Sequence, residues 1–226
     1  MTTNIVQISE IFYSLQGEGP AVGRPAIFIR FSKCNRSCKG CDSPQKDRIE
    51  EVETSSVVSR VQNYLKTYPN SRIIFTGGEP LLQPTAISEI MDGLPGQLFD
   101  IETNGTISDQ EELYKRFNIM VISPKKDCFT SSKDRNEFIT NWLKISDSGR
   151  KNIYFKFVVG NLPWAFLEAE IKDMFENTSL NPSRTWLMPA GDNSQKLSIS
   201  GKNTWKVACR LGCNYSDRLH IRCDGK

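Results

Sequence analysis

The sequence predicts an α/β protein built on a largely parallel sheet, and three observations support this class. Short runs rich in β-branched and aromatic residues alternate with longer helical patterns across almost the whole chain. A length of 226 residues with 24% charged side chains suits one sizeable core rather than a disordered or fibrous chain. No apolar run approaches the roughly 20 residues of a membrane span. We therefore expect a single domain over residues 1–226.

The expected elements follow one another as strand, helix, strand. The expected strands are short, β-branched or aromatic runs at 6–13, 26–31, 72–76, 98–102, 119–122, 153–159, 185–188 and 218–222. The expected helices have apolar residues at helical spacing and lie at 55–67, 84–92, 109–117, 134–145, 163–176 and 202–211. Thr54 or Ser55 is a start signal for the first helix, and Gly212 is a stop signal for the last. Ligand sites should collect at the carboxyl ends of the strands.

Charge and cysteine content restrict the class of function. The 29 Lys and Arg residues outnumber the 26 Asp and Glu residues by only three, which is too small an excess to predict nucleic-acid or membrane binding. Seven cysteines form an odd set for a disulfide framework, and the N-terminus lacks the features of a signal peptide. Both observations predict a cytoplasmic protein. The single histidine, His220, would have to carry any Ser-His-Asp mechanism alone.

Three cysteines stand together directly after the expected strand 26–31. Cys34, Cys38 and Cys41 have the spacing C-x3-C-x2-C, and soft thiolates select iron-sulfur clusters or zinc. Structural zinc normally takes four protein ligands, and a cluster of four irons normally takes four cysteines. Three cysteines would leave one iron open to a ligand outside the protein. An iron-sulfur cluster is the favoured prediction, with structural zinc and unliganded thiols as alternatives.

The remaining cysteines are expected to be small buried residues of the core. They are Cys128, Cys209, Cys213 and Cys223.

Polar clusters also follow three further strands. Gly77 and Gly78 would let backbone approach a ligand closely, and Glu79 beside them offers a carboxylate to an ammonium group, although GGEP alone could be a plain turn. The segments ETNGT at 102–106 and SPK at 123–125 end the next two strands. Each cluster is weak by itself, but four successive strand ends with polar clusters indicate one site.

The order of these motifs resembles one family. FYSLQGEG, GRPAIFIRF, C-x3-C-x2-CDS, TGGEP, ETNGT and SPK follow one another between about residues 10 and 125, with a looser match in LMPAG and RLHIR. This series resembles the 7-carboxy-7-deazaguanine synthases of the radical S-adenosylmethionine (radical SAM) superfamily. The resemblance implies a partial parallel (β/α)6-type barrel with an extra N-terminal strand.

The resemblance also implies an activity. Family members are carbon-nitrogen lyases that convert 6-carboxy-5,6,7,8-tetrahydropterin into 7-carboxy-7-deazaguanine, with loss of ammonia, for queuosine-type and archaeosine-type 7-deazapurines. A 4Fe-4S cluster and SAM provide the radical that abstracts hydrogen, so no catalytic side chain is expected, and Mg2+ assists. The alternatives are a radical SAM activase that makes a glycyl radical on a partner, or a non-catalytic zinc-binding module.

Residue roles come from the resemblance, position by position. Cys34, Cys38 and Cys41 would hold the cluster, and Ser43 would ligate Mg2+. The residues expected to contact SAM are Gly40, Cys41, Asp42, Glu79, Gly105, Ser123, Pro124 and Lys125. The residues expected to contact the pterin are Leu15, Gln16, Gly17, Arg30 and Thr103, with Arg30 pairing with the substrate carboxylate.

The expected partners are the small pterin substrate, an electron donor such as flavodoxin and a second copy of the chain in a homodimer. Basic residues are frequent in the loop that carries Cys34, Cys38 and Cys41, here called the cysteine loop. The loop therefore either docks an acidic reductase or is simply solvated. Relatives often end in a W-G-N-like tail, whereas this chain ends in HIRCDGK.

Overall fold

The computed structural model describes residues 4–38, 41, 48–125, 129–147, 152–223 and 225. Backbone contacts divide the chain into two compact units. The first unit comprises Met1–Gln16 and Arg24–Met120, and the second comprises Gly17–Gly23 and Val121–Lys226. Strand β6 (Ile119–Ile122) contains the division between Met120 and Val121.

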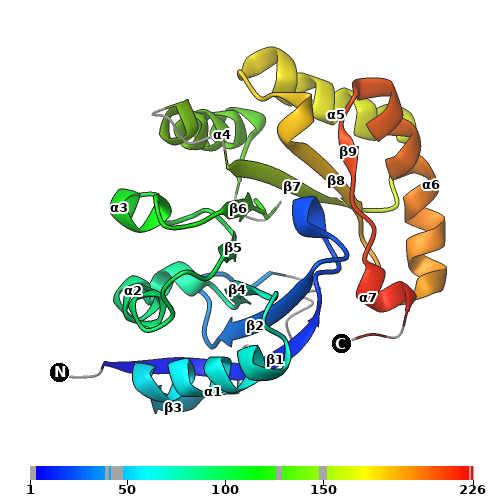
Figure 1. Cartoon of the computed structure of the whole chain (residues 1–226). Coiled ribbons are helices and arrows are strands. Elements are labelled where there is room, and N and C mark those ends of the chain that lie inside the picture. Colours follow the sequence, from blue (N-terminus) through cyan, green and yellow to red (C-terminus); the bar gives the residue numbers. More distant parts are fainter. Residues whose placement is uncertain are drawn as a thin grey trace. The chain divides into compact units, whose positions relative to one another are not determined.

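Strands of the first unit have the order β3-β1-β2-β4-β5 (Figure 1). Their bounds are β1 (Ile5–Leu15), β2 (Pro25–Phe31), β3 (Glu50–Glu53), β4 (Arg72–Gly77) and β5 (Phe99–Thr103). Strand β1 is antiparallel to both β2 and β3, whereas β2, β4 and β5 are parallel. The carboxyl ends of three parallel strands therefore meet at one edge of this sheet.

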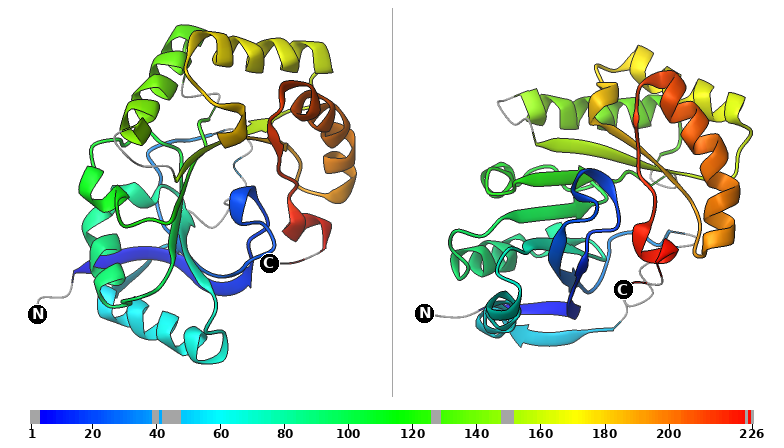
Figure 2. Two further views of the ribbon diagram at one scale, coloured as in Figure 1. Left: turned by 45° about the horizontal axis from the view of Figure 1, so that its top comes forward. Right: turned by 45° about the vertical axis from the view of Figure 1, so that its right-hand side comes forward.

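Helices of the first unit connect these strands. They are α1 (Thr54–Thr67), the 3-10 turn η3 (Pro80–Leu82), α2 (Pro84–Asp92) and the short α3 (Glu111–Tyr114). Helix α1 lies along β1 and β3 (Figure 2). In the core, the rings of Phe12 and Phe28 stack with centroids 4.9 Å apart, beside Ala26 and Ile74. Apolar side chains on adjacent strands thus pack this part of the sheet.

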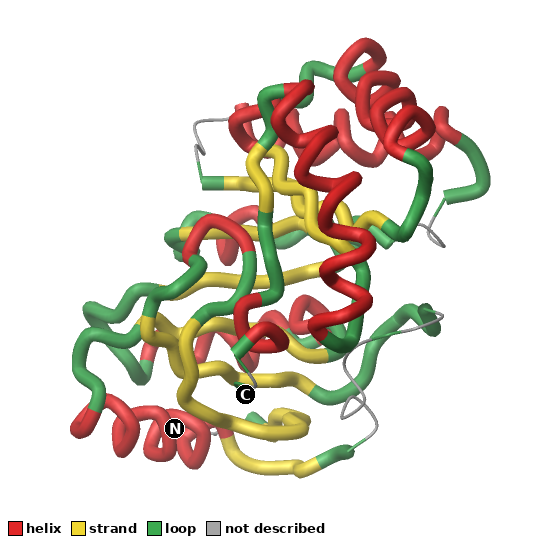
Figure 3. The backbone as a smooth tube through the Cα atoms, turned by 90° about the vertical axis from the view of Figure 1, so that its right-hand side faces the viewer, coloured by secondary structure: helices red, strands yellow, loops and turns green. Residues whose placement is uncertain are grey.

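The second unit contains the parallel strands β7 (Ile153–Val159), β8 (Thr185–Pro189) and β9 (Asn214–Tyr215). Its helical elements are η1 (Gly19–Ala21), α4 (Ser132–Asp147), α5 (Trp164–Asn177), η5 (Pro182–Arg184), α6 (Ser194–Leu211) and α7 (Leu219–Arg222). Helix α6 runs beside β8 and β9 (Figure 3). None of the helices in the described part of the chain is long and apolar enough to cross a membrane.

The predicted α/β class and the largely parallel sheet are confirmed, but some elements differ. The segment 218–222 was expected as a strand, but Leu219–Arg222 form the helix α7. The segment Glu50–Glu53, with three glutamates and one valine, forms the edge strand β3, which the sequence pattern did not predict. The last long helix begins at Ser194 rather than at 202, with the Asn193 side chain accepting a hydrogen bond from the Lys196 N–H. That cap satisfies one of the first N–H groups of the helix.

The expected burial of the other cysteines is wrong in part. Cys209 and Cys223 are exposed, while Cys213 is half-buried. Cys209 lies on the outer side of α6, where the neighbouring Arg210 is also exposed. Burial raises the pKa of the Cys213 thiol to about 12, so this group stays protonated at neutral pH. Cys128 lies outside the described residues.

Gly212 ends α6 as the sequence predicts, in the left-handed conformation with φ of 67°. We expect Gly212→Ala to lower the free energy of unfolding by about 1 kcal/mol, because a Cβ disfavours positive φ even where space is open. Urea unfolding measures this change. Gly160→Ala is the matched control, since no atom lies within 4 Å of its added Cβ and its φ is not positive. Equal losses in both variants would contradict the explanation.

Candidate functional site

The start of the cysteine loop contacts the segment Gly77–Glu79 at the end of β4. The Gly78 N–H donates to Phe31 O at 2.9 Å, and the Glu79 N–H donates to Lys33 O at 2.9 Å. A Cβ on Gly78 would lie 1.6 Å from Lys33 O, so only glycine permits this approach. Lys33 itself has a φ of 63°, in the left-handed region, so the chain turns sharply just before Cys34. The glycine pair therefore lets the segment after β4 pack closely against the start of the cysteine loop.

Glu79 is a fully buried carboxylate at the end of β4. Its Oε1 accepts from Thr103 Oγ at 2.7 Å and from the Leu81 N–H at 3.0 Å. Its Oε2 accepts from the Asn104 N–H at 2.8 Å. These bonds offset the cost of burying a charged group and join the ends of β4 and β5.

Asn104 connects this carboxylate to the cysteine loop. Its Nδ2 donates to Asn35 Oδ1 at 3.0 Å and lies 3.8 Å from Cys34 Sγ. Asn35 Nδ2 in turn donates to Thr106 Oγ at 2.7 Å. The ETNGT segment thus contacts both Glu79 and the first cysteine, as expected for polar groups at adjacent parallel strand ends.

The structure describes all three cysteines of the motif as free thiols. Cys34 and Cys38 are half-buried and Cys41 is exposed. Within the described residues, no three His, Cys, Asp or Glu side chains are gathered as a metal ion would require. The expected site residues Gly40, Asp42 and Ser43 lie outside the described residues.

Two expected substrate residues in the first unit have carboxylate partners. Gln16 is 6% exposed, and its Nε2 donates to Glu102 Oε1 at 3.0 Å. Arg30 donates through Nε to Glu10 Oε1 at 3.0 Å and lies over the ring of Phe12. Both contacts hold a polar side chain in one direction without involving a ligand.

Leu15 and Thr103 were expected just after strands 6–13 and 98–102; they are the last residues of β1 and β5, and they differ in burial. Thr103 is 3% exposed and accepts at its Oγ from the Gly105 N–H at 3.0 Å, in addition to donating to Glu79. Gly105 has a φ of 78°, which explains the glycine in this tight turn. Leu15 is 47% exposed at the end of β1.

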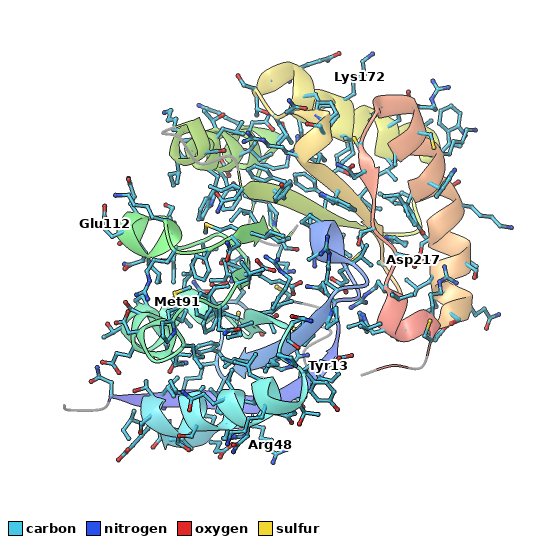
Figure 4. The ribbon with its side chains drawn as sticks, in the orientation of Figure 1. Tyr13, Arg48, Met91, Glu112, Lys172 and Asp217 are labelled. Atoms are coloured by element: carbon cyan, nitrogen blue, oxygen red, sulfur yellow. The ribbon has the colours of Figure 1, made fainter. Side chains whose placement is uncertain are left out.

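In the second unit, the loop Gly17–Gly19 is bonded to the segment before and within α7. Gly17 O accepts from the Leu219 N–H at 3.0 Å, and the Gly19 N–H donates to Ser216 Oγ at 2.9 Å. A Cβ on Gly17 would lie 2.2 Å from His220 Nδ1, so a larger residue has no room. Asp217, labelled in Figure 4, lies in this segment and accepts from Arg222 Nε at 3.0 Å.

Glu18 is the charged centre of that loop. Its carboxylate pairs with Lys156 of β7 and with Arg218 Nε at 3.0 Å, and all three side chains are at most 11% exposed. Burial alone would raise the pKa of Glu18, but the positive charges of Lys156 and Arg218 outweigh it and lower the pKa from 4.5 to about 2. Glu18 is therefore ionised at neutral pH.

The SPK segment follows β6 in the second unit. Lys125 Nζ donates to Ser123 Oγ at 3.2 Å, and Ser123 is 5% exposed. Pro124 lines a cavity of about 240 Å³, together with Phe157 and Val159 of β7. Other walls of this cavity come from α4 and α5. A mostly apolar cavity of this size has room for one heterocyclic ring system.

Sequence reasoning left several charged or polar partners without a role. They are Glu10, Glu18, Glu102, Asn104, Lys156 and Arg218. Glu18, Glu102 and Asn104 stand inside the motifs LQGEG and ETNGT, so motif membership was an available signal for them. Lys156 is a lysine in an otherwise apolar strand, IYFKFVV, and that pattern was the signal for a paired buried charge.

Comparisons with known proteins show which proteins this chain is similar to. A family model described as the radical SAM superfamily matches residues 28–120. A 7-carboxy-7-deazaguanine synthase of Halobacterium salinarum is 30% identical, over 95% of this chain and 88% of that protein. The synthase of Hyperthermus butylicus is 28% identical, over 96% of this chain and 92% of that protein.

A crystal structure of QueE from Escherichia coli shares the fold, with a TM-score of 0.64 and 19% identity over 96% of this chain and 95% of that chain. The predicted radical SAM type of α/β fold is thereby confirmed. The Halobacterium salinarum synthase, 30% identical over 95% of this chain, establishes the family. The chain belongs to the 7-carboxy-7-deazaguanine synthase family of the radical SAM enzymes.

Proposed function

We propose that this chain converts 6-carboxy-5,6,7,8-tetrahydropterin into 7-carboxy-7-deazaguanine and ammonia, as a carbon-nitrogen lyase of 7-deazapurine biosynthesis. One observation carries the proposal: the ends of β2, β4 and β5 are joined by hydrogen bonds that run from Cys34 through Asn104 to Glu79. These bonds connect a thiol and a buried carboxylate through Asn104, which suits a cluster near the ammonium of an amino acid group.

The donor set fits the cofactors that the superfamily implies. Three free thiols within eight residues are soft ligands for iron, so Cys34, Cys38 and Cys41 would hold a 4Fe-4S cluster. When bound, the cluster and SAM supply one-electron chemistry that removes a hydrogen atom from carbon. The residues proposed to hold SAM are Gly40, Cys41, Asp42, Glu79, Gly105, Ser123, Pro124 and Lys125. Ser43 is proposed as the ligand of Mg2+, which prefers oxygen donors.

Glu79 is proposed to accept a hydrogen bond from the ammonium group of SAM. Its two oxygens receive three hydrogen bonds, so its direction is set before any ligand arrives. A carboxylate held in this way can accept from an ammonium without first losing rotational freedom.

The substrate groups follow from the chemistry of the pterin. Arg30, whose Nε donates to Glu10, is proposed to pair with the substrate carboxylate, because a guanidinium group can bind a carboxylate through two hydrogen bonds. The Thr103 hydroxyl donates to Glu79, so toward the ring it would act as an acceptor. Leu15, Gln16 and Gly17 are proposed to complete the pterin site.

We also propose a single-domain organisation, a homodimer and an electron donor for this chain. Residues 1–226 would act as one radical SAM domain, in a homodimer, with an acidic electron donor such as flavodoxin. Lys33 and Arg36 on the cysteine loop supply positive charge for that donor. The free thiols suit the reducing cytoplasm.

The decisive test is an anaerobic assay of the reconstituted chain with SAM, Mg2+, a reductant and the carboxytetrahydropterin. We expect release of ammonia together with the absorption of a 7-deazaguanine. A brown chain that makes neither product would contradict the proposed substrate and favour a glycyl-radical activase. A colourless chain that binds zinc would instead favour the non-catalytic module.

We expect Cys38→Ala to abolish both the visible absorption of the reconstituted chain and product formation, since three thiolates are needed to hold the cluster. Cys209→Ala is the matched control. Its thiol is exposed on α6, so this variant should keep its colour and its turnover. Retention of colour and product by Cys38→Ala would overturn the ligand assignment.

The Glu18 ion pairs predict a defined dependence of stability on pH. Glu18→Gln should lower the free energy of unfolding by about 3–5 kcal/mol near neutral pH, because it leaves Lys156 and Arg218 buried without their anion. The pKa of Glu18 is lowered on folding, so the unfolded chain binds more protons below pH 4.5. Its stabilisation is complete above that pH and is lost as the pH falls toward about 2.

Urea unfolding of both proteins at about pH 6 and about pH 3 tests this prediction. The difference between wild type and Glu18→Gln should shrink at the lower pH. Glu168→Gln is the control, because its partner Arg210 is 52% exposed and such pairs contribute about 1 kcal/mol or less. A difference that stays constant with pH would contradict the assignment to Glu18.

A further inference from the structure

The Gln16 side chain is held by the carboxylate of Glu102, a residue of the ETNGT motif to which no role has been assigned so far. Gln16 Nε2 donates to Glu102 Oε1 at 3.0 Å, and Thr76 Oγ donates to Glu102 Oε2 at 3.1 Å. Each oxygen of Glu102 thus receives a donor. All three residues belong to the first unit, at the ends of β1, β4 and β5.

This contact decides which end of the Gln16 amide faces Glu102. An ionised carboxylate only accepts hydrogen bonds, so the amide must turn its NH2 group toward it. The carbonyl oxygen Oε1 then occupies the opposite end of the planar amide. A flipped amide would set two acceptors against each other and leave the NH2 group without this partner, which is costly for a side chain only 6% exposed.

The main chain restricts Gln16 as well. Its N–H donates to Arg24 O at 2.8 Å, which closes the loop between β1 and β2. With backbone and amide both held, the side chain has little freedom to present a different group to a ligand. A recognition group fixed before binding loses less entropy when the ligand arrives.

We propose that Glu102 is a positioning residue that sets Gln16 to present an acceptor to the C2 substituent of the ring, and so selects an amino group there over a carbonyl oxygen. The inference rests on the proposed function, in which Gln16 contacts the pterin. The pterin carries an amino group at C2, which is a donor. A lumazine keeps the N3–H donor but carries a carbonyl oxygen at C2, which would face the amide oxygen acceptor to acceptor.

Two non-reacting probes test this selection. Binding of 6-carboxypterin and 6-carboxylumazine to the anaerobically reconstituted chain with SAM is followed by the change in probe fluorescence. Wild type should prefer the pterin by about tenfold or more, the effect of one mismatched buried hydrogen bond. Glu102→Met fills a similar volume without an acceptor, so its preference should fall to within about twofold.

Two further variants complete the design. Glu102→Gln keeps one amide acceptor, so it should retain part of the preference. The matched control is Glu51→Gln, which removes the same type of contact from an exposed pair, where Gln7 Nε2 donates to Glu51 Oε1 at 2.6 Å. That control should bind both probes as wild type does.

The outcomes separate the inference from the proposed function. Wild type that binds neither probe would contradict the pterin substrate itself. Wild type that binds both probes equally, or a folded Glu102→Met that keeps the wild-type preference, would overturn the role of Glu102 alone. If Glu102→Met fails to fold by circular dichroism, Glu102→Gln decides, and an undiminished preference in that variant overturns the inference.

Discussion

The site depends on the hydrogen bonds that the buried carboxylate of Glu79 accepts. A charge with no exposure must be met by donors, and these come from Leu81, Thr103 and Asn104. The ETNGT segment is therefore tied to the end of β4. Because Gly78 also docks on the Lys33 carbonyl, the cysteine loop is placed by the same strand end. The cysteine loop, the Glu79 carboxylate and the ETNGT turn are thus joined by hydrogen bonds.

Carboxylates also hold the side chains that are proposed to contact the substrate. Glu10 holds Arg30, Glu102 holds Gln16, and Glu18 anchors the loop that follows Gln16. In each case an acceptor-only side chain fixes the direction of a donor. Such preorganisation lowers the entropy lost on binding, and it matters for a ring system whose edges differ only in donors and acceptors.

The elements that the sequence pattern missed share a physical cause. The segment RLHIR alternates like a strand, yet its hydrogen bonds are helical, and Arg222 pairs with Asp217 while Arg218 pairs with Glu18 about 200 positions away in the chain. Strand β3 is charged, but it pairs at the edge of the sheet, where one side of a strand needs no partner. Local patterns carry no information about such distant partners.

The sequence by itself determined the α/β class, the alternation of strands and helices, the cysteine motif and the family, because these depend on local spacing and on short motifs. Only the tertiary structure decided that Gly78 serves the approach of the cysteine loop, that Thr103 and Asn104 hold Glu79, and that Glu102 holds Gln16. Those pairings join residues 24 to 86 positions apart, so they exist only once the sheet has formed and brought distant strands and their following loops together.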